Sequence, residues 1–317
     1  MSGAAFLAFD EEALLDLANA VRRTGYRFVT VTPATHERVN RRPHNAWARS
    51  LADVFGWSRP FRAGVLPQDM FDLARRAGVL APHEDGWRSL VRFSSLDDEL
   101  FVHSAYPTTD VDAVFFGPDT GRLVDAVTAA LPGHDRPIRR AVDIGCGAGA
   151  GAIAIAKRAR GAEVIGVDVN PAALRATALN ARLAGVANVA SRASDMLRDL
   201  AGDFDLIVSN PPFMVDAAER AYRHGGGPLG AGLPLACVDA AVERLAPGGA
   251  LVLFTGVMVI EGETPFRDEA ARRLDAGGLA WSYREVDPDV YGEELDNPGY
   301  AQADRIALAV LTARKET

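Results

Sequence analysis

The tetrapeptide Asn-Pro-Pro-Phe, residues 210–213, directly follows an apolar run, FDLIVS, that has the composition of a buried strand. The side-chain oxygen of Asn210 and the carbonyl of Pro211 can each accept one N–H of a planar exocyclic nitrogen, which is a poor nucleophile. Both acceptors interact more strongly as the nitrogen gains positive charge during attack. The prolines fix the backbone, and Phe213 offers an apolar face for a planar group. These residues predict methyl transfer to a planar nitrogen, and the alternative is an ordinary strand-ending turn.

A glycine-rich stretch, AVDIGCGAGAG, places Asp143 at the end of another predicted strand. Gly145, Gly147 and Gly149 fall in the turn that opens the next predicted helix. Glycine there lets the backbone approach a ligand closely, and the helix N-terminus offers free N–H groups. The stretch therefore predicts a nucleotide-binding turn, and the alternative is a tight turn packed for its own sake.

Two further acidic residues follow the next two predicted strands. Asp168 ends AEVIGVDV, where a carboxylate can accept hydrogen bonds from both hydroxyls of a ribose. Asp195, in RASDM, follows the third strand at a place suited to accept from an adenine amino group. Because open α/β sheets bind ligands at the carboxyl ends of their strands, these acids indicate an adenosine-containing cofactor.

The same glycine spacing satisfies the dinucleotide pattern, so an NAD-dependent oxidoreductase is an alternative. Asp143, however, precedes the glycines, where its charge disfavours a pyrophosphate and favours a sulfonium and an ammonium. We therefore expect S-adenosyl-L-methionine as the cofactor. Asp143 and the glycines would hold its methionine part, with Asn210 nearby. Asp168 would hold the ribose and Asp195 the adenine.

These residues require a sheet that brings several strand ends to one edge. From about Arg139 the chain alternates β-rich runs with helical stretches, which is typical of a doubly wound, seven-stranded, mainly parallel α/β sheet. The last two strands have no helix between them and should pair antiparallel at one edge. Asn170 and Thr264, each followed by proline, are expected N-caps. The expected strands are 139–145, 162–169, 187–194, 204–210, 250–260, 279–286 and 304–314; the expected helices are 150–160, 170–185, 233–245 and one from 265.

The first hundred residues follow a different pattern. Helices are expected near Glu11–Arg23 and Pro67–Ala77, followed by a hairpin in WRSLVRFSSLDDELFVHSAY. We expect two domains. Residues 1–110 would form a smaller α+β, winged-helix-like domain for substrate recognition, and residues 111–317 the catalytic α/β domain.

Composition limits the class of protein. A length of 317 residues allows two moderate domains, and a net charge of -8 argues against binding nucleic acid through bulk electrostatics. Cys146 and Cys237 are too few for a disulfide framework or a Cys-built metal site, so no metal is expected. The N-terminus has no basic region of the signal-peptide kind, and the longest apolar run is too short to span a bilayer. We expect a cytoplasmic protein with no membrane association.

Two segments could select the substrate. Residues 20–62 carry nine arginines against Glu37 and Asp53, with aromatic residues between them, a mixture that can grip phosphates and stack bases. The alternatives are an interdomain packing surface and pairing with the acids of the α/β domain. Residues 214–234 form a glycine-rich loop that could close over the substrate, or merely connect two elements.

The motifs VDIGCGAG, GVDVN and SNPPF, in that order, resemble those of the class I S-adenosylmethionine-dependent N-methyltransferases over roughly Val111–Arg314. Within that group the chain is most similar to the release-factor glutamine methyltransferases, whose Pro-Arg-Pro-x-Thr-Glu segment corresponds to FFGPDTGRLVDAV. Phe213 stands where that family usually has Tyr, and resembles the ribosomal-RNA guanine methyltransferases. The residues that fit the upstream segment are Pro118, Asp119 and Thr120, and those that depart are Gly117 for Arg and Gly121 for Glu.

The resemblance implies methyl transfer from S-adenosyl-L-methionine to a planar nitrogen, with Asn210, Pro211 and Phe213 as the catalytic residues. The leading acceptor is a glutamine amide of a protein such as a release factor, and the next is a base amine of rRNA or tRNA. From other classes, an NAD-dependent oxidoreductase and a non-catalytic, cofactor-binding RNA adaptor stay open.

Overall fold

The computed structural model describes residues 9–131, 136–216, 220 and 222–316. The chain divides into two compact units. The first contains Met1–Gly121, Gly147–Ala150 and Asn170–Ala187, and the second contains Arg122–Cys146, Gly151–Val169 and Asn188–Thr317. The two domains expected from the sequence, residues 1–110 and 111–317, have other bounds than these units and stay a prediction.

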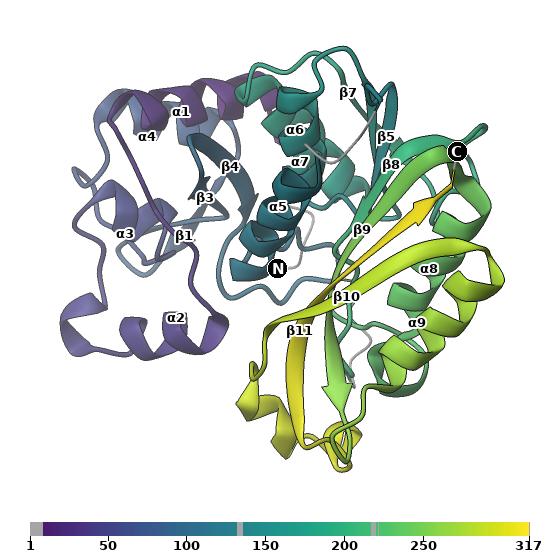
Figure 1. Cartoon of the computed structure of the whole chain (residues 1–317). Helices are drawn as coiled ribbons and strands as arrows, with labels where there is room; N and C mark the ends of the chain where they lie inside the picture. Colours follow the sequence, from purple (N-terminus) through teal and green to yellow (C-terminus); the bar gives the residue numbers. More distant parts are fainter. Residues whose placement is uncertain (1–8, 132–135, 217–219, 221, 317) are drawn as a thin grey trace. The chain divides into compact units, whose positions relative to one another are not determined.

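A seven-stranded sheet forms the centre of the second unit, in the order β10-β11-β9-β8-β5-β6-β7 (Figure 1). The five strands from β9 to β7 in this order pair in parallel, whereas β11 pairs antiparallel with both β9 and β10. The expected fold class, a doubly wound α/β sheet with an antiparallel edge pair, is confirmed. The strands are β5 (Arg140–Ile144), β6 (Glu163–Asp168), β7 (Val189–Ala193), β8 (Phe204–Ser209), β9 (Leu245–Val259), β10 (Leu279–Asp287) and β11 (Arg305–Lys315).

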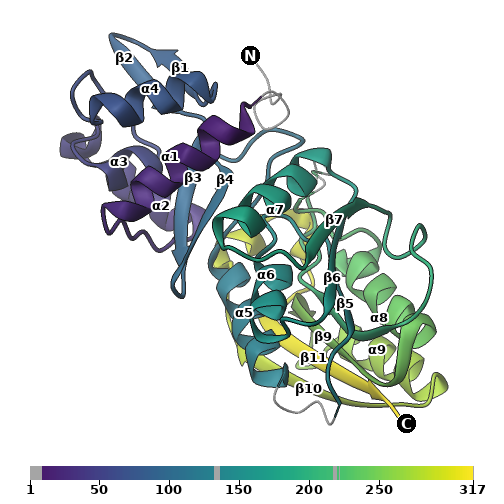
Figure 2. The same cartoon turned by 90° about the horizontal axis from the view of Figure 1, so that it is seen from above.

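Helices cover both faces of this sheet (Figure 2). On one face α8 (Gly232–Arg244) and α9 (Pro265–Ala276) pack with the strands in one buried apolar cluster. The other face carries α6 (Ala150–Arg158) and α5 (Pro118–Ala130). Because the central strands are buried from both sides, their side chains are apolar almost without interruption, as in Val142, Ile207 and Leu253.

The first unit combines short helices with two hairpins. Its helices are α1 (Glu11–Arg23), α2 (Pro33–Asn40), η1 (Pro43–Asn45), α3 (Leu51–Phe55), α4 (Gln68–Arg76) and α7 (Pro171–Leu183). Its strands are β1 (Leu80–His83), β2 (Gly86–Ser89), β3 (Val91–Leu96) and β4 (Glu99–Ser104), and α1 packs against α4 and α7. The two expected helices are confirmed. The single expected hairpin is wrong in part, because Trp87–Ser89 pair with β1 and only the later residues form β3 and β4. The winged-helix-like description stays a prediction.

The ends of two helices test the capping predictions. Asn170 caps α7 as expected, since its Oδ1 accepts from the Ala172 N–H at 2.9 Å. Thr264 occupies the N-cap position of α9 with Pro265 after it, as expected, but its side chain makes no capping hydrogen bond. Its backbone lies at φ -120°, ψ 89°, away from the extended conformation of Asn170 at φ -90°, ψ 113°.

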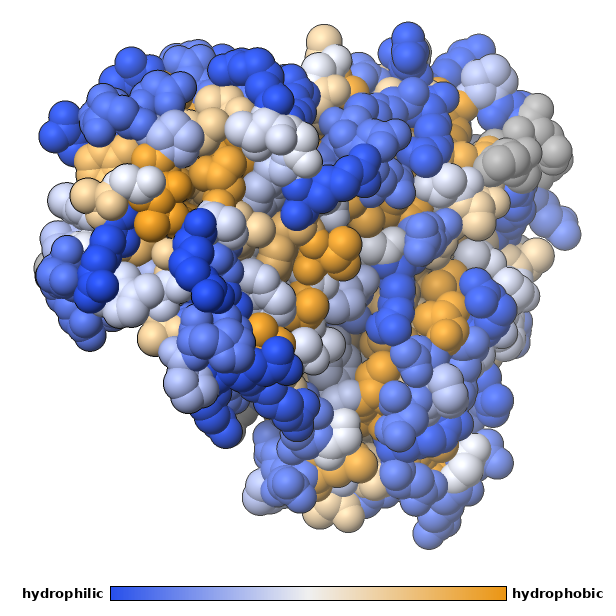
Figure 3. Space-filling model, turned by 90° about the vertical axis from the view of Figure 1, so that its left-hand side faces the viewer, coloured by the Kyte–Doolittle hydropathy of each residue, from blue (hydrophilic) through white to orange (hydrophobic). Residues whose placement is uncertain are grey.

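Hydrophilic residues cover much of the face seen in Figure 3, with apolar residues scattered among them. In the described parts of the chain, no helix has both the length and the apolar character needed to cross a bilayer.

Candidate active site

The register of the central strands brings three of the predicted residues into one row. Ile144 of β5 lies opposite Val167 of β6 and Ser209 of β8. The next residue along each strand is therefore Gly145, Asp168 or Asn210, all at the carboxyl edge of the sheet. Between β5 and β8 the strand order reverses, which is the topological switch point where open α/β sheets bind ligands.

Asp143 is buried directly below this row. Its exposed fraction is 2%, and its Oδ2 accepts a hydrogen bond from the Ala152 N–H at 2.8 Å. Burial raises the pKa of this carboxyl to about 7, the Ala152 bond opposes the shift, and the negative charge of Asp168 adds to it. A cation placed beside both carboxylates would favour their ionised forms.

A fourth glycine of the turn, which the sequence analysis did not single out, makes room for this carboxyl. A Cβ on Gly151 would lie 2.7 Å from the Asp143 Oδ2, so only glycine lets the helix approach so closely. The sequence signal for it is present, since Gly151 continues the spacing of Gly145, Gly147 and Gly149.

The three predicted glycines share a positive φ, with values of 69°, 53° and 81° for Gly145, Gly147 and Gly149. The N–H groups of Gly145 and Cys146 donate to the Val167 carbonyl at 2.8 and 3.0 Å, which fixes the start of the turn against the end of β6. A Cβ on Gly145 would meet nothing within 4 Å, so the space beside it is open. Gly147 and Gly149 belong to the first unit. In that unit the Thr177 Oγ1 donates a hydrogen bond to the Gly147 carbonyl at 3.0 Å.

Asp168 and Asp195 differ in their surroundings. Asp168 is half-buried at the end of β6, and its carbonyl accepts from the Ser194 N–H at 3.3 Å. Asp195 is exposed and forms an ion pair with Arg198, three residues later in the same turn. An adenine amino group would therefore meet a carboxylate that already has a partner. The roles of both acids stay predictions.

The side-chain oxygen of Asn210 lies at the carboxyl edge of the sheet and bears directly on the predicted chemistry. Its Oδ1 is buried and has no hydrogen-bond partner among the residues that the structure describes. A buried amide oxygen without a partner costs free energy, so such atoms point to a ligand or a catalytic role. The prediction that Asn210 accepts a hydrogen bond from a substrate N–H requires a free acceptor of this kind.

Ser209 anchors the backbone just before Asn210. It is fully buried, and its Oγ donates to the Ile144 carbonyl at 2.8 Å, which joins the ends of β8 and β5. The Sγ of Cys237 on α8 donates to the same Oγ at 3.4 Å, and burial raises the pKa of this thiol to about 12. Both cysteines are buried and form no disulfide.

Phe213 is packed closely by backbone. A Cβ on Gly256 of β9 would lie 2.3 Å from the Phe213 Cδ2, and a Cβ on Gly230 would lie 2.2 Å from its carbonyl oxygen. The Tyr291 ring lies at a centroid distance of 6.2 Å, and both rings pack on the buried cluster around Met214 and Met258. The position of Phe213 is therefore fixed, while its stacking role stays a prediction.

The loop after Phe213 is tied down at several points, although its residues 217–219 and 221 lie outside the described part. Asp216 pairs with Arg220 at 2.6 Å, and hydrogen bonds from Arg220 hold the pKa of that carboxyl at about 2. Arg223 forms an ion pair with Glu294, and the Val215 N–H donates to the Tyr300 hydroxyl at 2.8 Å. Closure of this loop over a substrate stays a prediction.

The arginines of residues 20–62 are engaged mainly within their own unit. Four of them pair with acids there, namely Arg27 with Asp98, Arg41 with Glu37, Arg59 with Asp53 and Arg62 with Asp85. Four others are exposed and have no such partner in the described part of the chain: Arg23, Arg38, Arg42 and Arg49. Among the described residues, no cluster of three or more His, Cys, Asp or Glu side chains could hold a metal ion.

Comparison with known proteins identifies the type of domain. Residues 120–259 match the family model described as the Methyltransferase small domain. The chain is 35% identical over 186 residues to the release factor glutamine methyltransferase of Rhodospirillum rubrum, covering 56% of this chain and 54% of the relative. It is 32% identical over 197 residues to the enzyme of the same name from Deinococcus radiodurans, covering 59% and 66%.

A third relative is named for a different acceptor. The chain is 36% identical over 134 residues to the ribosomal RNA small subunit methyltransferase C of Chromohalobacter salexigens, covering 42% of this chain and 36% of the relative. This chain thus spans less than two thirds of the length of each of these relatives. These matches confirm the predicted resemblance to class I methyltransferases of the glutamine and ribosomal-RNA groups.

Proposed function

We propose that the protein is an S-adenosyl-L-methionine-dependent N-methyltransferase. The observation that supports this most is the buried Oδ1 of Asn210, which has no partner among the described residues and stands at the switch point of the sheet. An oxidoreductase would have no evident use for this free acceptor. A cytoplasmic location belongs to the same proposal.

The residues at the edge fit this cofactor. The buried carboxyl of Asp143 and the open space beside Gly145 suit the cationic methionine part, and Asp168 stands in the same row for the ribose. Gly147 and Gly149 complete the turn. Asp195 would accept a hydrogen bond from the adenine amino group once its ion pair with Arg198 is broken. When bound, the cofactor supplies an electrophilic methyl group on a sulfonium.

The chain's own residues would then orient the acceptor. The Asn210 Oδ1 and the Pro211 carbonyl would each accept a hydrogen bond from one of the two N–H groups of a planar nitrogen. The lone pair of that nitrogen would then point toward the methyl group. Both dipoles are fixed before the reaction, by the proline backbone and by the Ser209 bond to β5, so they need no reorganisation as the nitrogen becomes positive. The proton becomes acidic once the methyl has been transferred, so no general base is required.

The acceptor that we propose first is a glutamine amide in a protein, because two of the relatives are named for that activity on a release factor. An exocyclic amine of an RNA base is the second candidate. It is favoured by four exposed arginines that form no ion pair with any described residue, and by the relative named for ribosomal RNA. These arginines are Arg23, Arg38, Arg42 and Arg49.

Tritiated-methyl transfer to release factors and to ribosomal or transfer RNA tests the proposal. Asn210→Ala should lower transfer about 100-fold or more while cofactor binding, measured by calorimetry, is retained. Asn210→Asp keeps an acceptor oxygen at the same position and should lose less than Asn210→Ala. Transfer that is equal in wild type and Asn210→Ala would contradict the proposed role of Asn210, and cofactor binding without transfer to any acceptor would favour the RNA adaptor.

A further inference from the structure

One stretch of the first unit carries exposed charge of a single sign. Residues 38–52 contain four arginines and no acidic residue, in a chain whose net charge is -8. The acids on either side, Glu37 and Asp53, already form ion pairs with arginines of the same unit. Residues 38–49 form the basic segment, which runs from the end of α2, labelled in Figure 1, through η1. In the described part of the chain, three of its exposed arginines have no side-chain hydrogen bond or ion pair: Arg38, Arg42 and Arg49.

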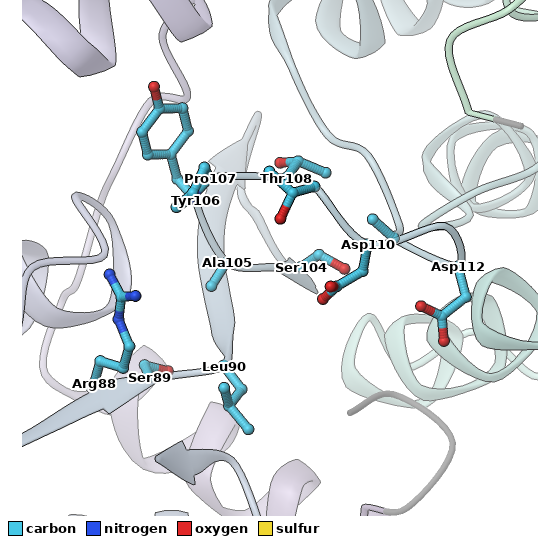
Figure 4. Close-up of a pocket in the computed structure, with 12 residues that line it drawn as sticks. Arg88, Ser89, Leu90, Ser104, Ala105, Tyr106, Pro107, Thr108, Asp110 and Asp112 are labelled. Atoms are coloured by element: carbon cyan, nitrogen blue, oxygen red, sulfur yellow. The ribbon is translucent and has the colours of Figure 1, made fainter. Parts of the chain in front are cut away.

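A pocket in the same unit has a mixed character (Figure 4). Arg88 lines it on one side, and Asp110 and Asp112 line it on the other. Two carboxylates against one guanidinium give this pocket no net attraction for an anion. The basic segment has only positive side-chain charges, so it is the better place for an anionic partner.

The backbone of the basic segment is fixed before any partner binds. The buried side chain of Asn45 donates from Nδ2 to the Val39 carbonyl at 2.8 Å, which holds η1 against the end of α2. The Ala48 N–H donates to the Pro60 carbonyl at 2.8 Å, which holds the end of the segment against the following loop. The arginines therefore project from an ordered surface, and binding requires little ordering of the backbone.

A planar group lies within the same surface. The guanidinium of Arg62 lies over the ring of Trp47, 4.2 Å from the ring centroid. The Arg62 Nε donates to the Asp85 carboxylate at 3.0 Å, so the charge of this arginine already has a partner. Its side chain is nevertheless 57% exposed. Because Trp47 covers one face of the guanidinium, Arg62 offers a partner its other face rather than its charge.

We propose that the basic segment and the stack of Arg62 on Trp47 bind a single-stranded polynucleotide. Its phosphates contact Arg38, Arg42 and Arg49, since a guanidinium can donate two hydrogen bonds to one phosphate group. An unpaired base lies on the open face of the Arg62 guanidinium, in the way that bases stack on arginine planes.

Other anionic partners use fewer of these groups. An acidic protein surface would pair with the three arginines but would leave the plane of Arg62 unused. A duplex would offer phosphates, but its bases already stack on one another. The proposal does not depend on methyl transfer, because it uses no residue of the candidate active site.

Fluorescence anisotropy on the full chain tests binding. The probes are a labelled oligoribonucleotide of about 12 nucleotides and the deoxyribonucleotide of the same sequence. The dissociation constant should lie below about 100 μM at low salt. Three phosphate contacts predict a slope of about -2 for log affinity against log salt concentration, at ~0.7 per contact. Tighter binding of the oligoribonucleotide would assign the site to RNA, and tighter binding of the deoxyribonucleotide would assign it to single-stranded DNA.

Removal of the three arginines without partners should remove this salt dependence. In the triple variant Arg38→Gln, Arg42→Gln and Arg49→Gln, the slope should fall by about 2 in magnitude. The melting temperature should stay close to that of wild type, because these side chains are exposed and make no contact that the fold needs.

A second triple variant removes the same number of charges from ion pairs. Arg27→Gln, Arg75→Gln and Arg76→Gln alter exposed arginines of the same unit that pair with acids there, and this control should keep most of the slope. An equal loss of slope in the two triple variants would show that only net charge matters, and would overturn the proposal.

Arg62→Lys separates stacking from charge. Lysine keeps the positive charge but has no plane on which a base can stack. Affinity for the single strand should fall about fivefold or more, with the salt slope unchanged. A duplex of the same sequence should bind this variant as well as it binds wild type, because it has no unpaired base to lose.

Three further results would overturn the proposal. These are no saturable binding of either oligonucleotide, single-strand affinity that is equal in Arg62→Lys and wild type, and displacement of the probe by poly-L-glutamate as efficiently as by unlabelled oligonucleotide. The last result would indicate an acidic protein partner instead. Asn210→Ala should bind the oligonucleotide as wild type does, so failure of methyl transfer and failure of this proposal can be told apart.

Discussion

At the scale of single residues, the ionisation of Asp143 should control cofactor binding. Its pKa lies near 7 in the folded protein because the carboxyl is buried, so below pH 7 the group is largely protonated. A cationic ligand favours the ionised form, and binding must then release a proton. We expect the affinity for S-adenosyl-L-methionine to rise with pH, by about tenfold per unit below 7 and little above it.

Calorimetry at several pH values between 6 and 8, in two buffers of different ionisation enthalpy, measures both the affinity and the proton released. The Asp143 carboxyl also affects the free energy of unfolding. Because its pKa is raised in the folded protein, its contribution to stability is greatest at low pH and falls as the pH rises toward 7. Asp143→Asn cannot ionise and should bind weakly with a flat profile. A flat profile in the wild type would contradict the assigned role of Asp143.

Gly151 supplies a second test at this scale. In Gly151→Ala the new methyl group would lie 2.7 Å from the Asp143 Oδ2, so the carboxyl or the helix must shift. We expect a loss of about 1–3 kcal/mol in the free energy of unfolding and weaker cofactor binding. Gly161→Ala is the matched control, since a Cβ there meets nothing within 4 Å. Equal melting temperatures for the two variants would show that the carboxyl has room to move.

The places of Asp143, Asp168 and Asn210 at or beside strand ends were predictable from the sequence, because apolar runs end at or just after them. Their roles stay predictions. Gly151 was missed because its role depends on the distance between a helix and a buried carboxyl, which sequence spacing does not reveal. The ion pair of Asp195 with Arg198 was missed for a similar reason, since it depends on how the turn is wound.

At the scale of elements, the packing of β9 against Phe213 should matter for methyl transfer rather than for cofactor binding. Gly256→Ala would place a methyl group 2.3 Å from the Phe213 ring and so displace it. We expect tritiated-methyl transfer to fall about tenfold or more, with the affinity for S-adenosyl-L-methionine retained. Gly292→Ala, where a Cβ has open space, is the control and should transfer normally. Normal transfer in both variants would contradict a positioning role for Phe213.

Long periodic elements were predicted well and short ones poorly. The helix expected at Glu11–Arg23 begins and ends as predicted, because Asp10 caps it and its apolar spacing is regular. The short α2 and α3 were not predicted, since their stability comes from contacts such as the His36 bond to the Trp57 carbonyl. β9 begins at Leu245, five residues before the apolar run, because Leu245 pairs with Phe204 across a register shift.

At the scale of the whole molecule, two buried histidines of the first unit should make stability depend on pH. Burial and the charge of Arg92 lower the pKa of His36 to about 4 and that of His103 well below its usual value. Both pKa values are lowered on folding, so stability is fully present above about pH 6.5 and is lost as pH falls from there. For His36 this amounts to about 2 kcal/mol between pH 6.5 and pH 5.

Thermal unfolding of the full chain at pH 7, 6 and 5 measures this effect. The melting temperature should fall with pH, and His36→Asn should fall less steeply than wild type even if it is less stable at pH 7. His44→Gln alters an exposed histidine of the same unit and should keep the wild-type slope. A melting temperature that does not change between pH 7 and pH 5 would show that these histidines accept protons in the folded state.

The central claim is that the carboxyl edge of the sheet binds S-adenosyl-L-methionine for methyl transfer. The measurement that tests it most directly is calorimetric titration of the purified protein with that cofactor and, separately, with NADH. The account predicts saturable binding of S-adenosyl-L-methionine alone, weakened in Asp168→Ala by about 1.5–3 kcal/mol for each lost hydrogen bond. Binding of NADH alone would contradict it, and would mean that Asn-Pro-Pro-Phe is only a strand-ending turn.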